Sequence, residues 1–302
     1  MTRLLSGILG PVTTPFDSET GDLAPVSFRS LLAAHLSAGL DGIVVAGSTG
    51  EAALLEEAER RQLVELARAV VPADKWLIVG VGGESTRLTI RRAADASARG
   101  ADAVLVVSPH YYGAAMTREA LAGHFLRVAD GCSVPVVLYN IPKYAHLTLE
   151  PSLVAELARH EQVIGIKDSS GDLVLLRAYL QSQSAAFSVL TGSGISLHAA
   201  LEMGARGGVL AVALFASALT LEVYDAFQFG NRNRAMTAQE RLVPLAREIV
   251  AGFGVAGVKA ALDSVGLAGG RVRSPLLPLR WAQRAEIREL LRAAELAPAN
   301  MT

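Results

Sequence analysis

Short apolar runs recur along the chain, and segments with helical spacing separate them. Most of the runs are rich in Val, Ile and Leu and do not alternate with polar residues, which is typical of parallel strands buried on both faces. We expect eight strands, at residues 7–12, 42–45, 76–81, 103–107, 134–139, 163–167, 187–190 and 207–212. Eight β/α units within roughly 230 residues predict a (β/α)₈ TIM barrel. The alternative is a doubly wound sheet, but no Gly-rich phosphate turn follows the first run.

The segments between the runs predict amphipathic helices. Residues 56–70 place Leu63, Leu66 and Val70 on one face with charged residues opposite. Ser85 and Thr117 precede two further helical segments and are expected to be their N-caps. Beyond residue 230 the strand pattern stops, and helices are predicted at residues 231–250, 255–265 and 281–296. We therefore divide the chain into a catalytic barrel, residues 1–230, and a C-terminal helical extension, residues 231–302.

Composition narrows the class of protein. The chain has 302 residues, of which 51% are hydrophobic and 19% charged, with a net charge of −1. This content excludes intrinsic disorder, and no basic cluster predicts a nucleic-acid partner. The uncharged apolar stretch at residues 207–221 is shorter than the about 20 residues that a membrane helix needs, and the N-terminal residues lack a secretory cleavage site.

Metal and redox chemistry find little support in the sequence. Cys132 is the single cysteine and has no partner at zinc-site spacing, and the six histidines are scattered. We therefore expect no metal, no cofactor and no disulfide. A chain without disulfides fits a reducing, cytoplasmic location.

Lys167 is the residue that points most directly to a type of reaction. In a TIM barrel the active site lies at the carboxyl ends of the strands, and Lys167 closes the sixth apolar run. Burial there disfavours the ammonium, and a neutral amine attacks a carbonyl to form a Schiff base. The alternative is a structural lysine paired with an acid such as Asp168. Only four of the 28 basic residues are lysines, and the other three fit a barrel mouth less well.

Other candidate residues follow neighbouring strands. Tyr139 ends the fifth run and could shuttle protons, or it could be a core tyrosine. Ser48 and Thr49 lie in a Gly-Ser-Thr-Gly-Glu turn, at the expected start of a helix, that could hold a carboxylate or could be an ordinary cap. Tyr111 and its neighbour Tyr112 could form an interface or a core pair.

Taken in order, these motifs resemble the dihydrodipicolinate synthase / N-acetylneuraminate lyase family of class I aldolases. The matching segments span nearly the whole chain and are residues 10–16, 47–51, 109–112, 138–142 and 165–168. The resemblance implies a TIM barrel that assembles as a homotetramer, a dimer of dimers.

The resemblance also implies a role for each matching residue. Lys167 would form the Schiff base with a 2-oxo acid, typically pyruvate, and Tyr139 would be the general acid and base. Thr49 would link Tyr139 by hydrogen bonds to Tyr111, supplied across the dimer interface. Ser48 and Thr49 would bind the carboxylate. We add Ser169 and Gly192, which follow the sixth and seventh runs, as further substrate-binding residues.

Two departures from the family pattern narrow the substrate. Tyr144 stands where dihydrodipicolinate synthases normally carry an arginine for the second substrate's carboxylate, although Lys143 could substitute. The loop at Gly192 lacks the acids that sialic acid lyases carry. The segments resemble those of 4-hydroxy-2-oxoglutarate and 2-keto-3-deoxy-sugar-acid aldolases.

We therefore predict a carbon–carbon lyase that releases pyruvate from a 4-hydroxy-2-oxo acid. Three alternatives stay open at this point. The first is 4-hydroxy-tetrahydrodipicolinate synthase. The second is a Schiff-base dehydratase of a deoxy-oxo-sugar acid. The third is a non-enzymatic protein that binds oxo acids on the same barrel.

Overall fold

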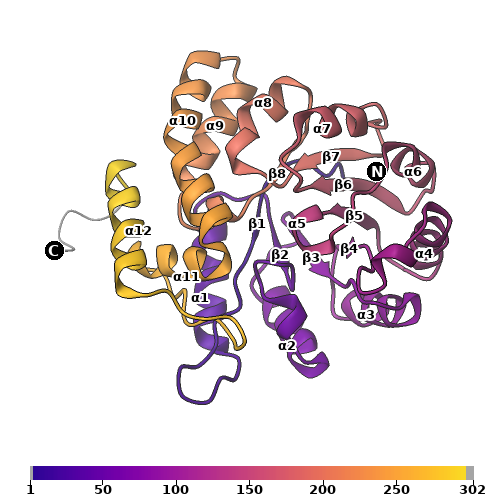
Figure 1. Cartoon of the computed structure of the whole chain (residues 1–302), viewed down its shortest axis with the longest axis horizontal. Coiled ribbons are helices and arrows are strands. Elements are labelled where there is room, and N and C mark those ends of the chain that lie inside the picture. The colour runs from indigo at the N-terminus through magenta and orange to yellow at the C-terminus, as the bar shows by residue number, and fades with distance from the viewer. Residues whose placement is uncertain (1–2, 297–302) are drawn as a thin grey trace.

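Eight parallel strands form a closed barrel in which β8 pairs with β1 (Figure 1). The computed structural model describes residues 3–296. The strands are β1 (Gly7–Pro11), β2 (Gly42–Val45), β3 (Trp76–Gly80), β4 (Ala103–Val107), β5 (Val136–Asn140), β6 (Val163–Asp168), β7 (Ser188–Thr191) and β8 (Gly207–Val209). The predicted TIM barrel is confirmed, and each strand overlaps the apolar run that predicted it.

Helices follow the strands around the barrel. They are α1 (Pro25–Ser37), α2 (Glu57–Arg68), α3 (Thr86–Ala98), α4 (Arg118–Asp130), α5 (Pro142–Ala145), α6 (Pro151–Leu157), α7 (Leu173–Leu180), α8 (Leu197–Glu202) and α9 (Ser217–Gln228). The two predicted N-caps are confirmed: the Ser85 hydroxyl accepts from the Leu88 amide at 3.1 Å, and the Thr117 hydroxyl accepts from the Ala120 amide at 3.2 Å.

Both faces of the barrel strands are buried, which explains why the runs do not alternate with polar residues. Along β2 and β3, Val44 and Ile78 point into the barrel interior, whereas Ile43 and Leu77 pack beneath the outer helices. Every residue of β2 is buried. An apolar side chain is therefore stabilising at Ile43, Val44 and Val45, whichever way it points.

A β-bulge in β6 sets which side chains of that strand face the interior. Val163 pairs with Val136 and Gly165 pairs with Val137, so Ile164 is an extra residue without a partner on β5. Ile164 faces the interior, while Ile166 packs in the outer layer. The bulge shifts the alternation by one residue, and Lys167 therefore faces inward instead of outward.

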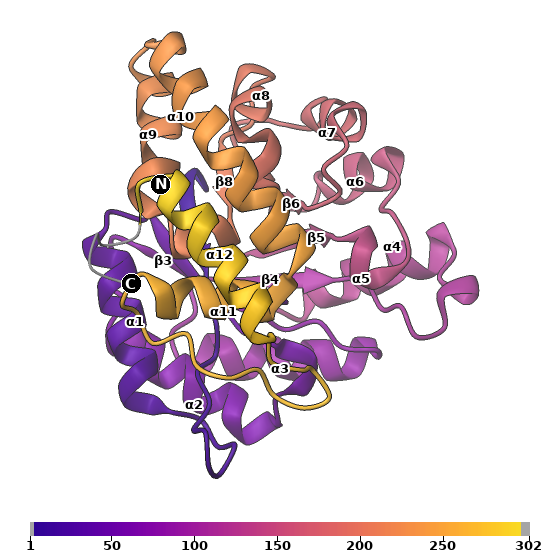
Figure 2. The ribbon, with the colours of Figure 1, turned by 60° about the vertical axis from the view of Figure 1, so that its left-hand side comes forward.

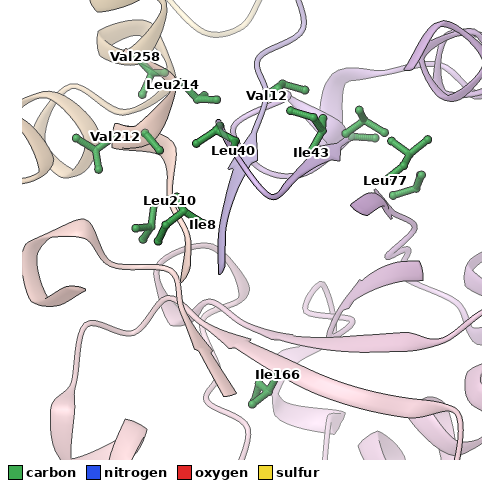
Figure 3. Close-up of a cluster of buried hydrophobic side chains, with 14 of the residues drawn as sticks. Ile8, Val12, Leu40, Ile43, Leu77, Ile166, Leu210, Val212, Leu214 and Val258 are labelled. Atoms are coloured by element: carbon green, nitrogen blue, oxygen red, sulfur yellow. The ribbon is translucent and has the colours of Figure 1, made fainter. Parts of the chain in front are cut away.

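The C-terminal helices gather on one side of the barrel (Figures 1 and 2). They are α10 (Arg232–Pro244), the π-helix η5 (Leu245–Gly252), α11 (Gly254–Ser264) and α12 (Trp281–Ala293). Figure 3 shows Val258 of α11 beside Leu214, which follows β8, within one apolar cluster. The extension is thus joined to the barrel by a shared core. The domain boundary at residue 230 stays a prediction, and residues 297–302 lie outside the described part.

The helix predicted over residues 231–250 is found, but its geometry changes along its length. Its last six residues belong to the π-helix η5, which begins directly after Pro244. Proline has no backbone N–H and its ring crowds the carbonyl four residues earlier, so the regular hydrogen-bond ladder is interrupted there.

The described residues contain neither a membrane-spanning helix nor a cluster of metal ligands. No helix within residues 3–296 is both long and apolar enough to cross a membrane. The same residues contain no group of three or more His, Cys, Asp or Glu side chains placed to hold a metal ion.

Two buried histidines are expected to make the folded protein less stable at low pH. His35 in α1 is 1% exposed, and burial lowers its pKa from 6.5 to about 4. Below pH 6.5 the unfolded chain binds a proton at this residue that the folded chain does not bind until about pH 4. The free energy of unfolding therefore falls as the pH falls through this window, by about 2 kcal/mol at pH 5 from this residue.

Urea unfolding of the wild type and of His35→Phe checks this expectation at neutral pH and at about pH 5. The variant should lose less stability between the two conditions than the wild type. The variant should still lose some stability at pH 5, because burial also lowers the pKa of His124 to about 4. An unchanged loss in His35→Phe would contradict the assignment.

Candidate active site

A cavity of about 280 Å³ opens at the carboxyl ends of the barrel strands. Six of the seven predicted site residues line it, namely Ser48, Thr49, Tyr139, Lys167, Ser169 and Gly192. They come from β5, β6 and the loops after β2, β6 and β7. Residues far apart in the sequence thus meet because the carboxyl ends of all parallel strands open at one face of the barrel.

Lys167 and Tyr139 form the centre of the cavity. They are register partners on β6 and β5, so their side chains emerge next to each other. The Lys167 Nζ lies 4.2 Å from the centroid of the Tyr139 ring. Both residues are 4% exposed, and what remains exposed opens to the cavity. An amine held in this way can reach a carbonyl carbon that enters from the mouth.

The alternative of a lysine paired with Asp168 does not describe this site. Asp168 accepts hydrogen bonds from Asn140 Nδ2 at 2.8 Å and from the Ser170 amide and hydroxyl at 3.0 and 2.9 Å. Burial raises the pKa of Asp168. Lys167 makes no ion pair with any described residue. Its amine is therefore not committed to a carboxylate.

The hydroxyl nearest to Tyr139 differs from the expected one. The Ser48 Oγ lies 3.4 Å from the Tyr139 Oη, and Thr49 lines the same cavity without a hydrogen bond to Tyr139. The hydrogen-bond contact of the Tyr139 hydroxyl in this structure is thus to Ser48 and not to Thr49. The turn that holds both residues leads into a short 3₁₀ helix (Ala52–Leu54), and α2 begins only at Glu57.

Tyr111 is the predicted residue that the fold does not bring into the cavity. Its side chain is 77% exposed, and Tyr112 beside it is also exposed. The loop is held by Glu84, whose carboxylate accepts hydrogen bonds from the amides of His110 and Tyr111 at 3.0 and 2.9 Å. Within one chain, Tyr111 therefore cannot complete a relay through Tyr139.

Ser169 and Gly192 are packed directly against each other. The Gly192 amide donates to the Asp168 carbonyl at 2.6 Å, which joins the loop after β7 to the last residue of β6. A Cβ atom at position 192 would lie 1.9 Å from the Ser169 Oγ. Only glycine leaves room for the Ser169 hydroxyl at this place.

A buried ion pair between Lys259 and Glu51 lies beneath the Ser48–Thr49 turn and was not predicted from the sequence. Lys259 of α11 and Glu51 are 1% and 0% exposed in their side chains, and Lys259 Nζ lies 2.5 Å from Glu51 Oε1. Lys259 Nζ also donates to the carbonyls of Thr14 and Arg271 at 2.7 and 2.6 Å. Glu51 has a φ of +57°, an uncommon left-handed conformation for a non-glycine residue. The C-terminal extension therefore anchors the turn that lines the site.

Comparison with known proteins agrees with this geometry. The model of the dihydrodipicolinate synthetase family matches residues 4–294. The chain belongs to this family. It is accordingly an enzyme, a lyase of the class I, pyruvate-dependent aldolase type.

Relatives in the family carry a more specific name. A Methanoculleus marisnigri protein named 4-hydroxy-tetrahydrodipicolinate synthase is 34% identical over 290 residues, which is 95% of this chain and 99% of that protein. A Streptomyces coelicolor protein, named 4-hydroxy-tetrahydrodipicolinate synthase 1, is 36% identical over 95% of this chain and 92% of its own length.

A solved structure of the family matches the fold closely. YagE, a prophage protein of the dihydrodipicolinic acid synthase family from E. coli K12, was solved in complex with pyruvate. It aligns with a TM-score of 0.92 at 29% identity and covers 98% of this chain and 100% of that one.

Proposed function

We propose that the protein cleaves a 4-hydroxy-2-oxo acid to pyruvate and an aldehyde through a Schiff base at Lys167. The observation that carries this proposal is the buried Lys167 amine, 4.2 Å from the centroid of the Tyr139 ring and free of any ion pair with a described residue. The substrate class includes 4-hydroxy-2-oxoglutarate and 2-keto-3-deoxy sugar acids. The two hydroxyls at Ser48 and Thr49 would hold the carboxylate next to the ketone.

The reaction balances without a cofactor. The Lys167 amine adds to the C2 ketone, water leaves, and an iminium ion results. A base removes the proton of the C4 hydroxyl, the C3–C4 bond breaks, and its electron pair moves into the iminium to give an enamine and an aldehyde. A proton returns to C3, and water releases pyruvate and the free amine. The reverse sequence forms the same bond.

Tyr139 is placed to move the protons in these steps. Its phenol lies beside both the amine and the Ser48 hydroxyl, at 3.4 Å from the latter. A phenol within a chain of hydrogen bonds can donate and accept protons in turn, and such transfer typically contributes about 10²- to 10⁴-fold to the rate. We assign Tyr139 this role and Ser48 the first position in the relay.

We further propose that the chain works as a homotetramer built from dimers, with Tyr111 entering the partner's site. The exposure of Tyr111, outside its own cavity, supports this arrangement. Lys167→Ala and Tyr111→Phe should each be poorly active alone, the latter by about 10²-fold or more. Co-expressed with different tags and purified as hybrids, they should regain activity, because one site per dimer then holds both native residues.

Tyr112→Phe is the matched comparison for that experiment. If Tyr112 and not Tyr111 supplies the phenol, only the Tyr112 variant will be complemented. Hybrids that stay inactive with both variants would rule out a tyrosine shared between subunits.

The second candidate function is 4-hydroxy-tetrahydrodipicolinate synthase. It is favoured by the names of the relatives that are 34% and 36% identical to the chain over nearly its full length. It shares the Schiff base at Lys167 but forms a bond to a second substrate. Tyr144, at the place where the synthases carry an arginine, favours the first candidate.

The products decide between these reactions. Incubation with pyruvate and borohydride should reduce the iminium and leave a stable adduct on Lys167, and an unmodified Lys167 would refute the Schiff-base mechanism itself. Release of pyruvate from 4-hydroxy-2-oxo acids supports the aldolase. Formation of 4-hydroxy-tetrahydrodipicolinate supports the synthase, and a dehydrated product with its carbon chain intact supports the dehydratase.

A further inference from the structure

The charges that line the site cavity are unbalanced. Two lysines, Lys143 and Lys167, line it, and no Asp or Glu side chain does so among the described residues. The 2-oxo acid carboxylate balances one positive charge, at the Schiff base. The ammonium of Lys143 is left without an anionic partner, because it forms no ion pair within residues 3–296.

Lys143 is an exposed residue, and contacts on two sides hold its side chain at the wall of the cavity. It lies in α5, which directly follows β5 and Tyr139. Its Nζ donates to the Ala251 carbonyl, near the end of η5, at 2.9 Å and lies 5.8 Å from the centroid of the Tyr144 ring. An ammonium has three N–H donors, and the carbonyl uses one of them. Two donors therefore remain for a ligand.

The walls of the cavity also show which ligands they do not suit. Hydroxyl groups of a sugar chain are commonly held by carboxylates, and the described lining contains no Asp or Glu side chain. A carboxylate instead accepts hydrogen bonds, and a charge-assisted bond to an ammonium is stronger than one between neutral groups. The hydroxyls of Ser48, Thr49, Ser169 and Ser193 on the same walls can donate to anionic oxygens as well.

We propose that Lys143 binds a second carboxylate at the far end of the substrate, so that the preferred substrates are 2-oxo dicarboxylates. The aldehyde that the reaction releases then carries a carboxylate. This inference rests on the proposed Schiff base at Lys167, which fixes the other end of the molecule. Lys143 is thus a specificity-determining residue for the distal end of the substrate.

Two five-carbon probes test this without any turnover. 2-Oxoglutarate has a distal carboxylate, and 2-oxopentanoate has a methyl group in the same place. Borohydride trapping on Lys167, measured against probe concentration by intact-protein mass, gives the half-saturating concentration of each. In the wild type we expect 2-oxoglutarate to be trapped at a concentration about tenfold or more below that of 2-oxopentanoate.

Substitutions at position 143 test whether Lys143 causes the preference for 2-oxoglutarate over 2-oxopentanoate. Lys143→Met should reduce the preference for 2-oxoglutarate to within about twofold, and Lys143→Arg should retain most of it, because the guanidinium also binds carboxylates. Lys75→Met, which removes a partly buried lysine at the opposite end of the barrel next to Asp41, should leave the preference unchanged. A merely structural tether to Ala251 predicts a different result, namely that Lys143→Met weakens the trapping of both probes equally.

Trapping of pyruvate, which has no distal carboxylate, distinguishes a failure of the Schiff-base proposal from a failure of the Lys143 proposal. If pyruvate is not trapped by the wild type, the proposed Schiff base is wrong. If pyruvate is trapped but the wild type does not prefer 2-oxoglutarate, or Lys143→Met keeps that preference, only the role of Lys143 is overturned.

Discussion

Replacing Lys167 with alanine is expected to abolish both the trapped pyruvate adduct and turnover. The side chain supplies the nitrogen of the Schiff base, and no other lysine has its Nζ beside Tyr139 in the described structure. Loss of a covalent nucleophile commonly costs on the order of 10⁴-fold or more in rate. Mass spectrometry of the borohydride-treated protein and a pyruvate-release assay measure the two effects.

Tyr139→Phe is the matched control for Lys167→Ala. It removes only the phenol oxygen and keeps the ring that packs beside the amine. We expect the pyruvate adduct still to form while turnover falls by about 10²- to 10⁴-fold. An adduct on a different residue in Lys167→Ala, or full turnover without Lys167, would overturn the mechanism.

Removing either partner of the Lys259–Glu51 pair is expected to destabilise the protein strongly. Both groups are almost completely buried, and burial lowers the pKa of Lys259 although Glu51 opposes the shift. A single substitution leaves the other charge buried and unpaired, which typically costs about 3 to 5 kcal/mol. Lys259→Met and Glu51→Gln should each lower the free energy of unfolding by roughly this amount, as measured by urea denaturation.

The double variant and an exposed ion pair provide the controls. Combining Lys259→Met with Glu51→Gln should cost much less than the sum of the two single effects, because each removes the same interaction. Arg284→Met breaks the half-exposed pair with Asp263, at 3.5 Å, and should cost about 1 kcal/mol or less. Additive effects of the two buried substitutions would show that the pair is not coupled.

The candidate site shows which functional residues can be predicted from residue type and position at a strand end. Lys167, Tyr139, Ser48 and Thr49 could each be proposed because chemistry-bearing side chains stood at the ends of apolar runs, where a barrel places its active site. The family resemblance implied that Thr49 faces Tyr139, but the strand pattern could not test this, since neighbouring residues of a turn point in directions that depend on its backbone angles. The structure gives this place to Ser48.

Lys259 is the opposite case, because its position in the C-terminal helices gave no reason to predict a role for it near the site. It lies in a helix beyond the last strand, about 200 residues after Glu51 in the sequence. Such a contact depends on how the extension packs against the barrel, and no local pattern reports it. A lysine within an apolar helical segment was the available signal, since lysine is almost never fully buried unless it is paired.

The sequence by itself determined the barrel, because eight apolar runs with helices between them bury their surfaces well in only a few ways. It also determined the family and the lysine that carries its chemistry. Only the tertiary structure decided how that lysine points. The bulge at Ile164 shifts the alternation of β6 by one residue, so that Lys167 faces the cavity while Asp168 is held by Asn140 and Ser170. The pairing of β6 with β5 determines which residues face inward, and the residues of β6 alone do not show where that pairing is interrupted.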